Sequence, residues 1–176
     1  MDRNIWIERK FEFVLPAWMF PYTVERLRGG PARLEDATRG MPAAELTGRI
    51  DGRWSIQEHA GHLFDLESLW SRRLDELVEG SAHLTAWEQT NRATEEANHN
   101  MSSLETILCK FRATRMSFVQ RLDALDDSDI ERTALHPRLQ KPMRTIDLVY
   151  FVAEHDDHHL AEIARLKRTL HCAQPK

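Results

Sequence analysis

Residues 145–170, with the sequence TIDLVYFVAEHDDHHLAEIARLKRTL, are the part of this chain that decides its fold. Large apolar side chains recur in this stretch at three- and four-residue steps, which places them on one face of an α-helix. They include Leu148, Val152, Ile163, Leu166 and Leu170. The stretch therefore predicts a long amphipathic helix that begins near Thr145, ends near Leu170 and packs its apolar face into a core.

Two histidines interrupt this apolar face. His155 and His159 are four residues apart, so on a helix they lie about 40° from each other within the apolar sector, with His158 at its edge. A buried neutral imidazole needs partners for both ring nitrogens, which is difficult for two rings on one stripe. A metal ion removes the difficulty, because imidazoles at positions i and i+4 can bind one ion, with Glu162 as an acceptor for a remaining nitrogen. The alternative interpretation is that one ring joins a core hydrogen-bond network and the other is partly hydrated.

Three further segments predict helices that pack beside the last one. The first is residues 4–40, which proline and glycine break; the second is residues 55–79, which open with Ser55-Ile56-Gln57-Glu58; the third is residues 102–125, which open with Ser102-Ser103-Leu104-Glu105. Each of the two quoted tetrapeptides is a capping box, in which serine and glutamate satisfy each other's backbone donors. No stretch alternates with a period of two long enough to predict a strand. The sequence therefore predicts an all-α four-helix bundle, one domain over residues 1–176, with the polar residues 80–100 and the arginine-rich loop 134–144 as connections.

A third metal ligand is expected from the second helix, which contains His59 and His62. The helical periodicity places His59 within the apolar stripe and His62 on its margin, so periodicity slightly favours His59. Gly61 argues for the other choice, because a residue without a side chain lets a neighbouring helix or a ligand come close. From the residues alone the choice stays open.

Two strings carry a resemblance to a known family: WSIQEHAGHLFDLE at residues 54–67 and FVAEHDDHHLAEI at residues 151–163. Together they resemble the DinB/YfiT-like family of metalloenzymes, and the resemblance extends from about Glu25 to Leu170. It implies a four-helix bundle with a long crossover connection, assembled as a homodimer. It also implies that the metal ligands are His62, His155 and His159, and that His59 has a role in the core or behind the ligands.

The resemblance implies a function as well. Several members of the family are transferases that use a metal to activate a low-molecular-weight thiol (bacillithiol, mycothiol or glutathione), so we expect a thiol-dependent transferase acting on a small electrophilic substrate. A divalent metal, zinc or nickel first and iron or manganese next, suits a three-imidazole site. One alternative is a metal-dependent hydrolase in which Glu162 or Asp65 assists. Another is a metal-stabilised stress-response protein that binds a partner and catalyses nothing.

Arg115 occupies an otherwise apolar step of the third helix. Its guanidinium is a candidate to grip a substrate carboxylate; the alternatives are a salt bridge to a neighbouring helix or a side chain that reaches water. Cys109 is expected in the core and Cys172 on the surface, neither of them a nucleophile.

Composition excludes several classes of protein. The chain is 41% hydrophobic and 30% charged, which is the balance of a folded globular protein. Its 24 Lys and Arg against 28 Asp and Glu leave no basic excess for nucleic acid, and no apolar run predicts a membrane span or a signal peptide. Two isolated cysteines exclude a disulfide framework. We therefore expect a cytoplasmic protein that binds neither nucleic acid nor a membrane. The family resemblance implies that its partners are a small-molecule substrate and a second copy of itself.

Overall fold

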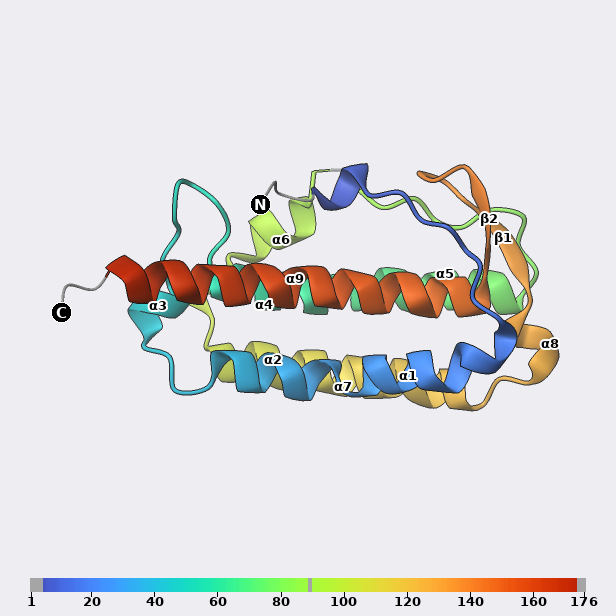
Figure 1. Cartoon of the computed structure of the whole chain (residues 1–176), viewed down its shortest axis with the longest axis horizontal. Coiled ribbons are helices and arrows are strands. Elements are labelled where there is room, and N and C mark those ends of the chain that lie inside the picture. Colours follow the sequence, from blue (N-terminus) through green and yellow to red (C-terminus); the bar gives the residue numbers. More distant parts are fainter. Residues whose placement is uncertain (1–4, 89, 174–176) are drawn as a thin grey trace.

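The long C-terminal helix predicted from the sequence is the axis of the structure. It is α9, Thr145–Ala173, whose 29 residues extend over about 43 Å. Figure 1 shows it along the whole length of a computed structural model, which describes residues 5–88 and 90–173. The predicted start is confirmed, and the helix runs a few residues beyond the predicted end.

Three other rods complete the predicted four-helix bundle (Figure 1). The first is α1, Phe20–Arg28, continued by α2, Gly30–Thr38; the second is α4, Ile56–Asp65, continued by α5, Glu67–Val78; the third is α7, Leu104–Asp123. The predicted break in the first rod lies at Gly29. Its helical part begins later than predicted, because residues 9–16 are extended.

Short elements precede the first rod or connect one rod to the next. They are the 3-10 turns η1, Trp6–Glu8, η2, Ala17–Met19, and η3, His99–Met101, and the helices α3, Ala43–Thr47, α6, Arg92–Ala97, and α8, Asp127–Ile130. Among the residues described, no helix has the length and apolar character that crossing a membrane requires.

The two predicted capping boxes have different outcomes. At α4, Ser55 Oγ accepts from the backbone N–H of Glu58 at 3.1 Å, and the Glu58 carboxylate accepts from the N–H of Ser55 at 2.8 Å. At α7 the prediction is wrong by one residue, since Ser103 is the N-cap and accepts from the N–H of Thr106 at 3.2 Å. Both caps begin a helix of the bundle at a serine.

The prediction that residues 134–144 form an irregular loop is wrong. They contain an antiparallel hairpin of β1, Thr133–His136, and β2, Lys141–Arg144, in which Ala134 pairs with Met143. Each strand has four residues, too few for alternation to be recognised in the sequence. Ala134 and Met143 are buried and close one end of the core, and this hairpin holds His136 and Arg138 beside α9.

The core consists of two apolar clusters separated by an ion-pair network. One cluster contains Phe118 and Val152, and the other contains Phe111 and Ile163. Arg115 lies on α7 between Phe111 and Phe118 and is completely buried. Of the alternatives open for Arg115, the structure therefore shows the salt bridge to neighbouring helices.

Arg115 joins three helices. Its guanidinium donates to Glu67 of α5, with an Nη2–Oε1 distance of 2.6 Å, and to both carboxylate oxygens of Asp156 on α9. Burial by itself lowers the pKa of Arg115, but the two carboxylates outweigh burial and raise it. A Cβ at Gly30 of α2 would lie 3.0 Å from Asp156 Oδ2 and 3.1 Å from Arg115 Nη1, so the glycine lets α2 pack close to the network without displacing these side chains.

Replacement of Arg115 by methionine leaves two buried carboxylates without their cation. We expect Arg115→Met to lower the free energy of unfolding by about 3–5 kcal/mol, measured by urea denaturation at pH 7. The control is Arg112→Met on the same helix, since Arg112 pairs with Glu35 at 2.7 Å with both side chains partly exposed. The control should cost less than about 1 kcal/mol, and equal losses in the two variants would contradict the assigned role of Arg115.

Candidate metal centre

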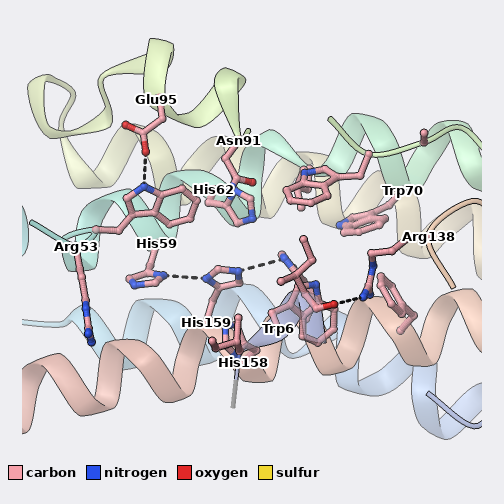
Figure 2. Close-up of a pocket in the computed structure, with 18 of the residues that line it drawn as sticks. Trp6, Arg53, His59, His62, Trp70, Asn91, Glu95, Arg138, His158 and His159 are labelled. Carbon is pink, nitrogen blue, oxygen red and sulfur yellow. Dashed lines mark hydrogen bonds between the residues drawn. The ribbon is translucent and has the colours of Figure 1, made fainter. Parts of the chain in front are cut away.

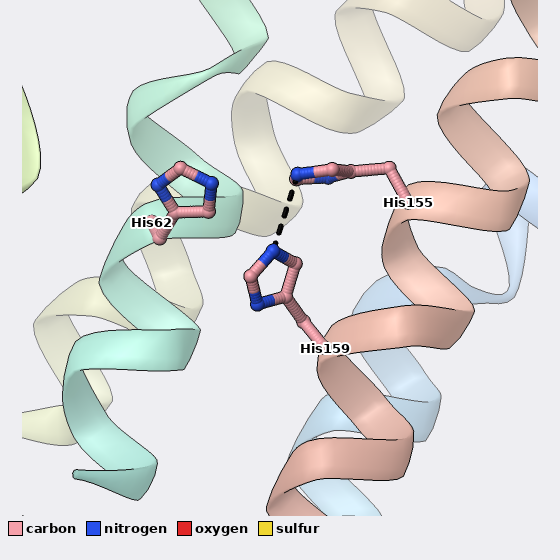
Figure 3. Close-up of side chains that lie close together, drawn as sticks. All are labelled: His62, His155 and His159. Carbon is pink, nitrogen blue, oxygen red and sulfur yellow. Dashed lines mark hydrogen bonds between the residues drawn. The ribbon is translucent and has the colours of Figure 1, made fainter. Parts of the chain in front are cut away.

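Three buried histidines meet between two rods of the bundle. His62 comes from α4, and His155 and His159 come from successive turns of α9 (Figure 3). One nitrogen of each ring lies within 4.8 Å of the others, and the three residues are only 4%, 2% and 5% exposed. The structure therefore brings together the three residues that the family resemblance singled out, with His62 rather than His59 in the cluster.

A hydrogen-bonded chain determines which nitrogen of His62 carries the proton. Thr94 Oγ1 donates to Asp65 Oδ2 at 2.8 Å and has only one hydrogen to donate. His62 Nδ1 lies 2.9 Å from the same hydroxyl and must therefore be its donor. The lone pair of a neutral His62 is then on Nε2, where it is free to bind an electrophile.

Gly61 has the close contact that the sequence led us to expect. The ring of His99, from η3, packs directly on it, and a Cβ at position 61 would lie 2.2 Å from two carbons of that ring. His99 Nε2 lies 2.8 Å from Asp65 Oδ2, the oxygen that also accepts from Thr94. The missing side chain thus lets η3 reach the helix that carries His62.

Hydrogen bonds join three imidazole rings in a row, from His59 through His159 to His155. His159 Nδ1 lies 2.8 Å from His59 Nδ1, and His159 Nε2 lies 3.1 Å from His155 Nε2 (Figures 2 and 3). His155 Nδ1 is buried and has no hydrogen-bond partner in the described part of the chain. Hydrogen bonding within the protein therefore leaves the His155 ring only half satisfied, which is unusual for a buried polar group.

Burial keeps the three rings neutral. It lowers the pKa of His62 to about 3, and it lowers the pKa values of His155 and His159 well below the usual value of imidazole. The neighbouring imidazoles act in the same direction, because a second positive charge nearby is unfavourable. At neutral pH each ring therefore keeps a lone pair, as a metal ligand requires.

The cluster forms part of the wall of a cavity of about 1000 Å³. Large aromatic side chains also line the cavity near the cluster, namely those of Trp6, Trp54, Trp70 and Phe151. Trp6 and Trp70 meet the His155 ring edge to face, with centroids 5.1 and 5.6 Å away. A molecule in the cavity has direct access to the three imidazoles.

The donor set fits a divalent metal of the zinc type. Zinc takes imidazole nitrogens at about 2.0–2.1 Å, and a tetrahedral ion separates them by roughly 3.4 Å. His155 and His159 already have their Nε2 atoms 3.1 Å apart, and the whole set lies within 4.8 Å, so small ring movements bring all three within reach. Three protein ligands on a cavity wall leave coordination positions that face the cavity.

The other sequence-based candidates are placed away from the cavity wall. Glu162 accepts from Arg165 at 3.0 Å, Arg115 is in the ion-pair network, and Asp65 supports His62 from behind through Thr94. None of these three residues lines the cavity, so direct contact with a substrate there is not supported for them. Cys109 is exposed rather than in the core, because it lies on the outer face of α7.

Several residues of the site were not identified from the sequence. Thr94 and His99 belong to the polar stretch between the second and third rods, where no periodicity marks an inward position. Trp6 precedes the bundle and reaches the cluster only because the extended N-terminal segment runs back along α9 (Figure 1). No local sequence pattern carries these contacts, since each joins elements far apart in the chain.

Comparisons with known proteins agree with this fold. Residues 26–163 match the family model of the DinB superfamily. Among solved structures, YfiT from Bacillus subtilis is similar, with a TM-score of 0.81 and 19% identity over 93% of this chain and 94% of that one. That protein is described as a probable metal-dependent hydrolase with an unusual four-helix bundle topology. A search of curated proteins found no match.

The packing of His99 on Gly61 is testable by adding one methyl group. We expect Gly61→Ala to lower the free energy of unfolding by about 1–3 kcal/mol, because the new Cβ would lie 2.2 Å from the His99 ring. Gly29→Ala is the control: its nearest atoms would be 3.5 Å away, so it should be neutral or stabilising by up to about 1 kcal/mol. Thermal and urea unfolding measure both effects, and a Gly61→Ala protein as stable as wild type would contradict this packing.

Proposed function

Because the chain belongs to the DinB superfamily, we propose that its three-histidine cluster holds a divalent metal and that the protein is a metal-dependent hydrolase of a small organic molecule. One observation carries the proposal: three neutral imidazoles converge on the wall of a cavity large enough for a substrate. The similarity to YfiT supports the reaction class, since that protein is described as a probable metal-dependent hydrolase.

His62, His155 and His159 would hold the metal. Zinc or nickel suits this set best, and iron and manganese also accept imidazole ligands. A bound divalent ion supplies Lewis acidity and lowers the pKa of water to about 7. The desolvated rings favour the metal further, because their low pKa values remove competition from protons at neutral pH.

The surrounding residues orient these ligands. His62 Nδ1–H donates to the Thr94 hydroxyl, which in turn donates to Asp65, and this chain holds the His62 ring in the tautomer with Nε2 free. His59 contacts the Nδ1 atom of His159 in the same way, so His159 Nε2 is turned toward His155. Each contact fixes a ring without using the nitrogen that would bind the ion.

Glu95, rather than Glu162 or Asp65, is the carboxylate that we propose accepts a proton from water during hydrolysis. Among the described residues that line the cavity it is the one carboxylate. It accepts a hydrogen bond from Trp54 Nε1 at 2.6 Å, which holds it at the rim (Figure 2). A carboxylate in this position can accept a proton from water that enters the cavity.

Transfer of a low-molecular-weight thiol is the second candidate function. The volume of the cavity, about 1000 Å³, is at the upper end of the range for small-molecule sites. It leaves room for a thiol such as bacillithiol, mycothiol or glutathione beside an electrophilic substrate. A metal at the cluster would then stabilise the thiolate form of that thiol.

Metal loading followed by an activity panel tests both candidates. We expect the purified protein, freed of metal and reloaded with zinc, nickel, iron or manganese, to bind one ion per chain, measured by elemental analysis. His155→Ala should lose this binding. His171→Ala should keep it, because His171 is exposed on the last turns of the same helix, where its Nδ1 contacts the Lys167 carbonyl.

The loaded protein is then assayed against esters and amides, with and without thiols. Hydrolysis without any thiol that disappears in His155→Ala supports the hydrolase, and turnover only with a thiol supports the transferase instead. Absence of stoichiometric metal in the wild type, or equal binding by His155→Ala, would overturn the proposed metal site.

Thr94 is a positioning residue whose role is separable from folding. We expect Thr94→Val to weaken metal affinity by about 10–100-fold, because His62 Nδ1–H loses its acceptor. Thr94→Ser keeps the hydroxyl and should bind metal as the wild type does. Competition with a chromophoric chelator measures the affinities. Equal affinities for the valine and serine variants would exclude this role.

A further inference from the structure

Two arginines line the cavity at the end opposite Arg53. Arg73 comes from α5, and Arg138 comes from the turn between β1 and β2. Figure 2 shows Arg138 beside Trp70 and Arg53 beyond His59, with the histidines between them. Arg73 and Arg138 therefore make one end of the cavity cationic, next to the wall that carries the histidines.

Arg73 is buried with neutral partners. Its residue is 1% exposed; Nε donates to the Thr85 carbonyl at 3.0 Å, and the guanidinium lies over Trp70 at 5.5 Å. These contacts include no carboxylate in the described part of the chain. Burial lowers the pKa of Arg73 to about 10, although Glu76 acts in the opposite direction, so the site holds this cation at a cost in desolvation.

Arg138 is similarly short of partners. Its Nη1 donates to the Ile7 carbonyl at 2.7 Å, and its guanidinium lies 5.8 Å from the centre of the Phe151 ring. The other terminal nitrogen, Nη2, is buried without a hydrogen-bond partner among the described residues. Here too burial lowers the pKa of the guanidinium.

His136 does not neutralise either arginine. Its Nδ1 accepts from the backbone N–H groups of Arg138 and Leu139, each at 3.2 Å, so the proton of the neutral ring is on Nε2. That Nε2 lies 3.2 Å from Arg73 Nη1, which is also a donor. The contact therefore places two N–H donors, His136 Nε2 and Arg73 Nη1, next to each other with no acceptor from the described residues between them. An acceptor atom bound near both would give each donor a hydrogen-bond partner.

Arg115, the buried arginine of α7, differs from Arg73 and Arg138 in having carboxylate partners. Arg115 has two carboxylates, Glu67 and Asp156, within hydrogen-bond distance. A buried guanidinium such as Arg73 that has no carboxylate of the described residues within hydrogen-bond distance is costly, and the partly buried Arg138 adds a second positive charge on the same cavity wall. An anion that enters the cavity would supply the partner that these two arginines lack within the described part of the protein.

From these contacts we propose that Arg73 and Arg138 form a subsite for an anionic group of the substrate, a carboxylate or a phosphate, whose reacting group faces the three histidines. This inference rests on the proposed function, because it takes the cluster as the reaction centre. A guanidinium fork can bind two oxygens of a carboxylate or of a phosphate in a bidentate manner, so it suits either group.

The position of Trp70 between the arginines and the histidines indicates the kind of substrate that fits. The Trp70 ring lies between the two sites, its centre 5.5 Å from Arg73 Cζ and 5.6 Å from the centre of the His155 ring. Trp70 and Phe151 provide an apolar wall along this path. The substrate class is therefore a small organic acid with an apolar, planar segment between its anionic group and the bond that reacts.

Binding to the metal-free protein tests the subsite apart from the metal. The probes are phenylacetate, phenyl phosphate and the neutral phenylacetamide, titrated at low salt by calorimetry. We expect at least one anion to bind about tenfold or more tightly than the amide. Arg138→Gln should remove this preference. Arg53→Gln, at the other end of the same cavity, should leave it unchanged.

A second measurement does not depend on how a variant folds. In the wild-type protein, NMR signals of the guanidinium N–H groups of Arg73 and Arg138 should shift on addition of the better anion and not on addition of phenylacetamide. Preference for phenylacetate identifies a carboxylate substrate, and preference for phenyl phosphate identifies a phosphate monoester.

The outcomes separate this inference from the proposed function. Equal binding of all three probes, or a preference that survives in Arg138→Gln, would overturn the anionic subsite whatever the metal analysis shows. If the anion binds as expected while zinc does not, the subsite stands and the hydrolase proposal falls.

Discussion

The buried ion pairs of Arg115 are the constraint on which the position of the histidines depends. Arg115 connects α7 to Glu67 on α5 and to Asp156 on α9. Asp156 is the residue after His155, and Glu67 follows His62 within the same rod. A slip of one helix would separate these charges in a dry environment, so the network holds α9 in the register at which its imidazoles meet His62.

The chemistry of the candidate metal centre depends on the burial of its imidazole rings beside two arginines. Burial keeps the imidazoles of His62, His155 and His159 neutral, with lone pairs available. On the same cavity wall, the guanidinium of Arg73 donates to a backbone carbonyl, and Nη2 of Arg138 has no hydrogen-bond partner among the described residues. The cavity thus combines a wall of electron-pair donors with a cationic end. In the proposed subsite this polarity would orient a small acidic molecule toward the cluster.

The fold and the chemistry rest on different observations. At 19% identity the match to YfiT shows the arrangement of helices, and many reactions can be built on one arrangement. The aromatic wall, the Asp65–Thr94 support of His62 and the two arginines are properties of this chain's own side chains. The proposals on metal binding and on the substrate rest on these features and not on the fold.

What the sequence by itself determined is local. The helix of residues 145–170, the cap at Ser55 and the shared face of His155 and His159 follow from helical periodicity, which acts over a few residues. Periodicity alone slightly favoured His59, and the resemblance to a family was needed to select His62. Only the tertiary structure decided the hairpin at residues 133–144, the contacts of Thr94 and His99, and the partners of Arg115. Each of these contacts joins segments that are distant in the sequence. Such contacts produce no periodic pattern within a single segment, so the sequence alone does not predict them.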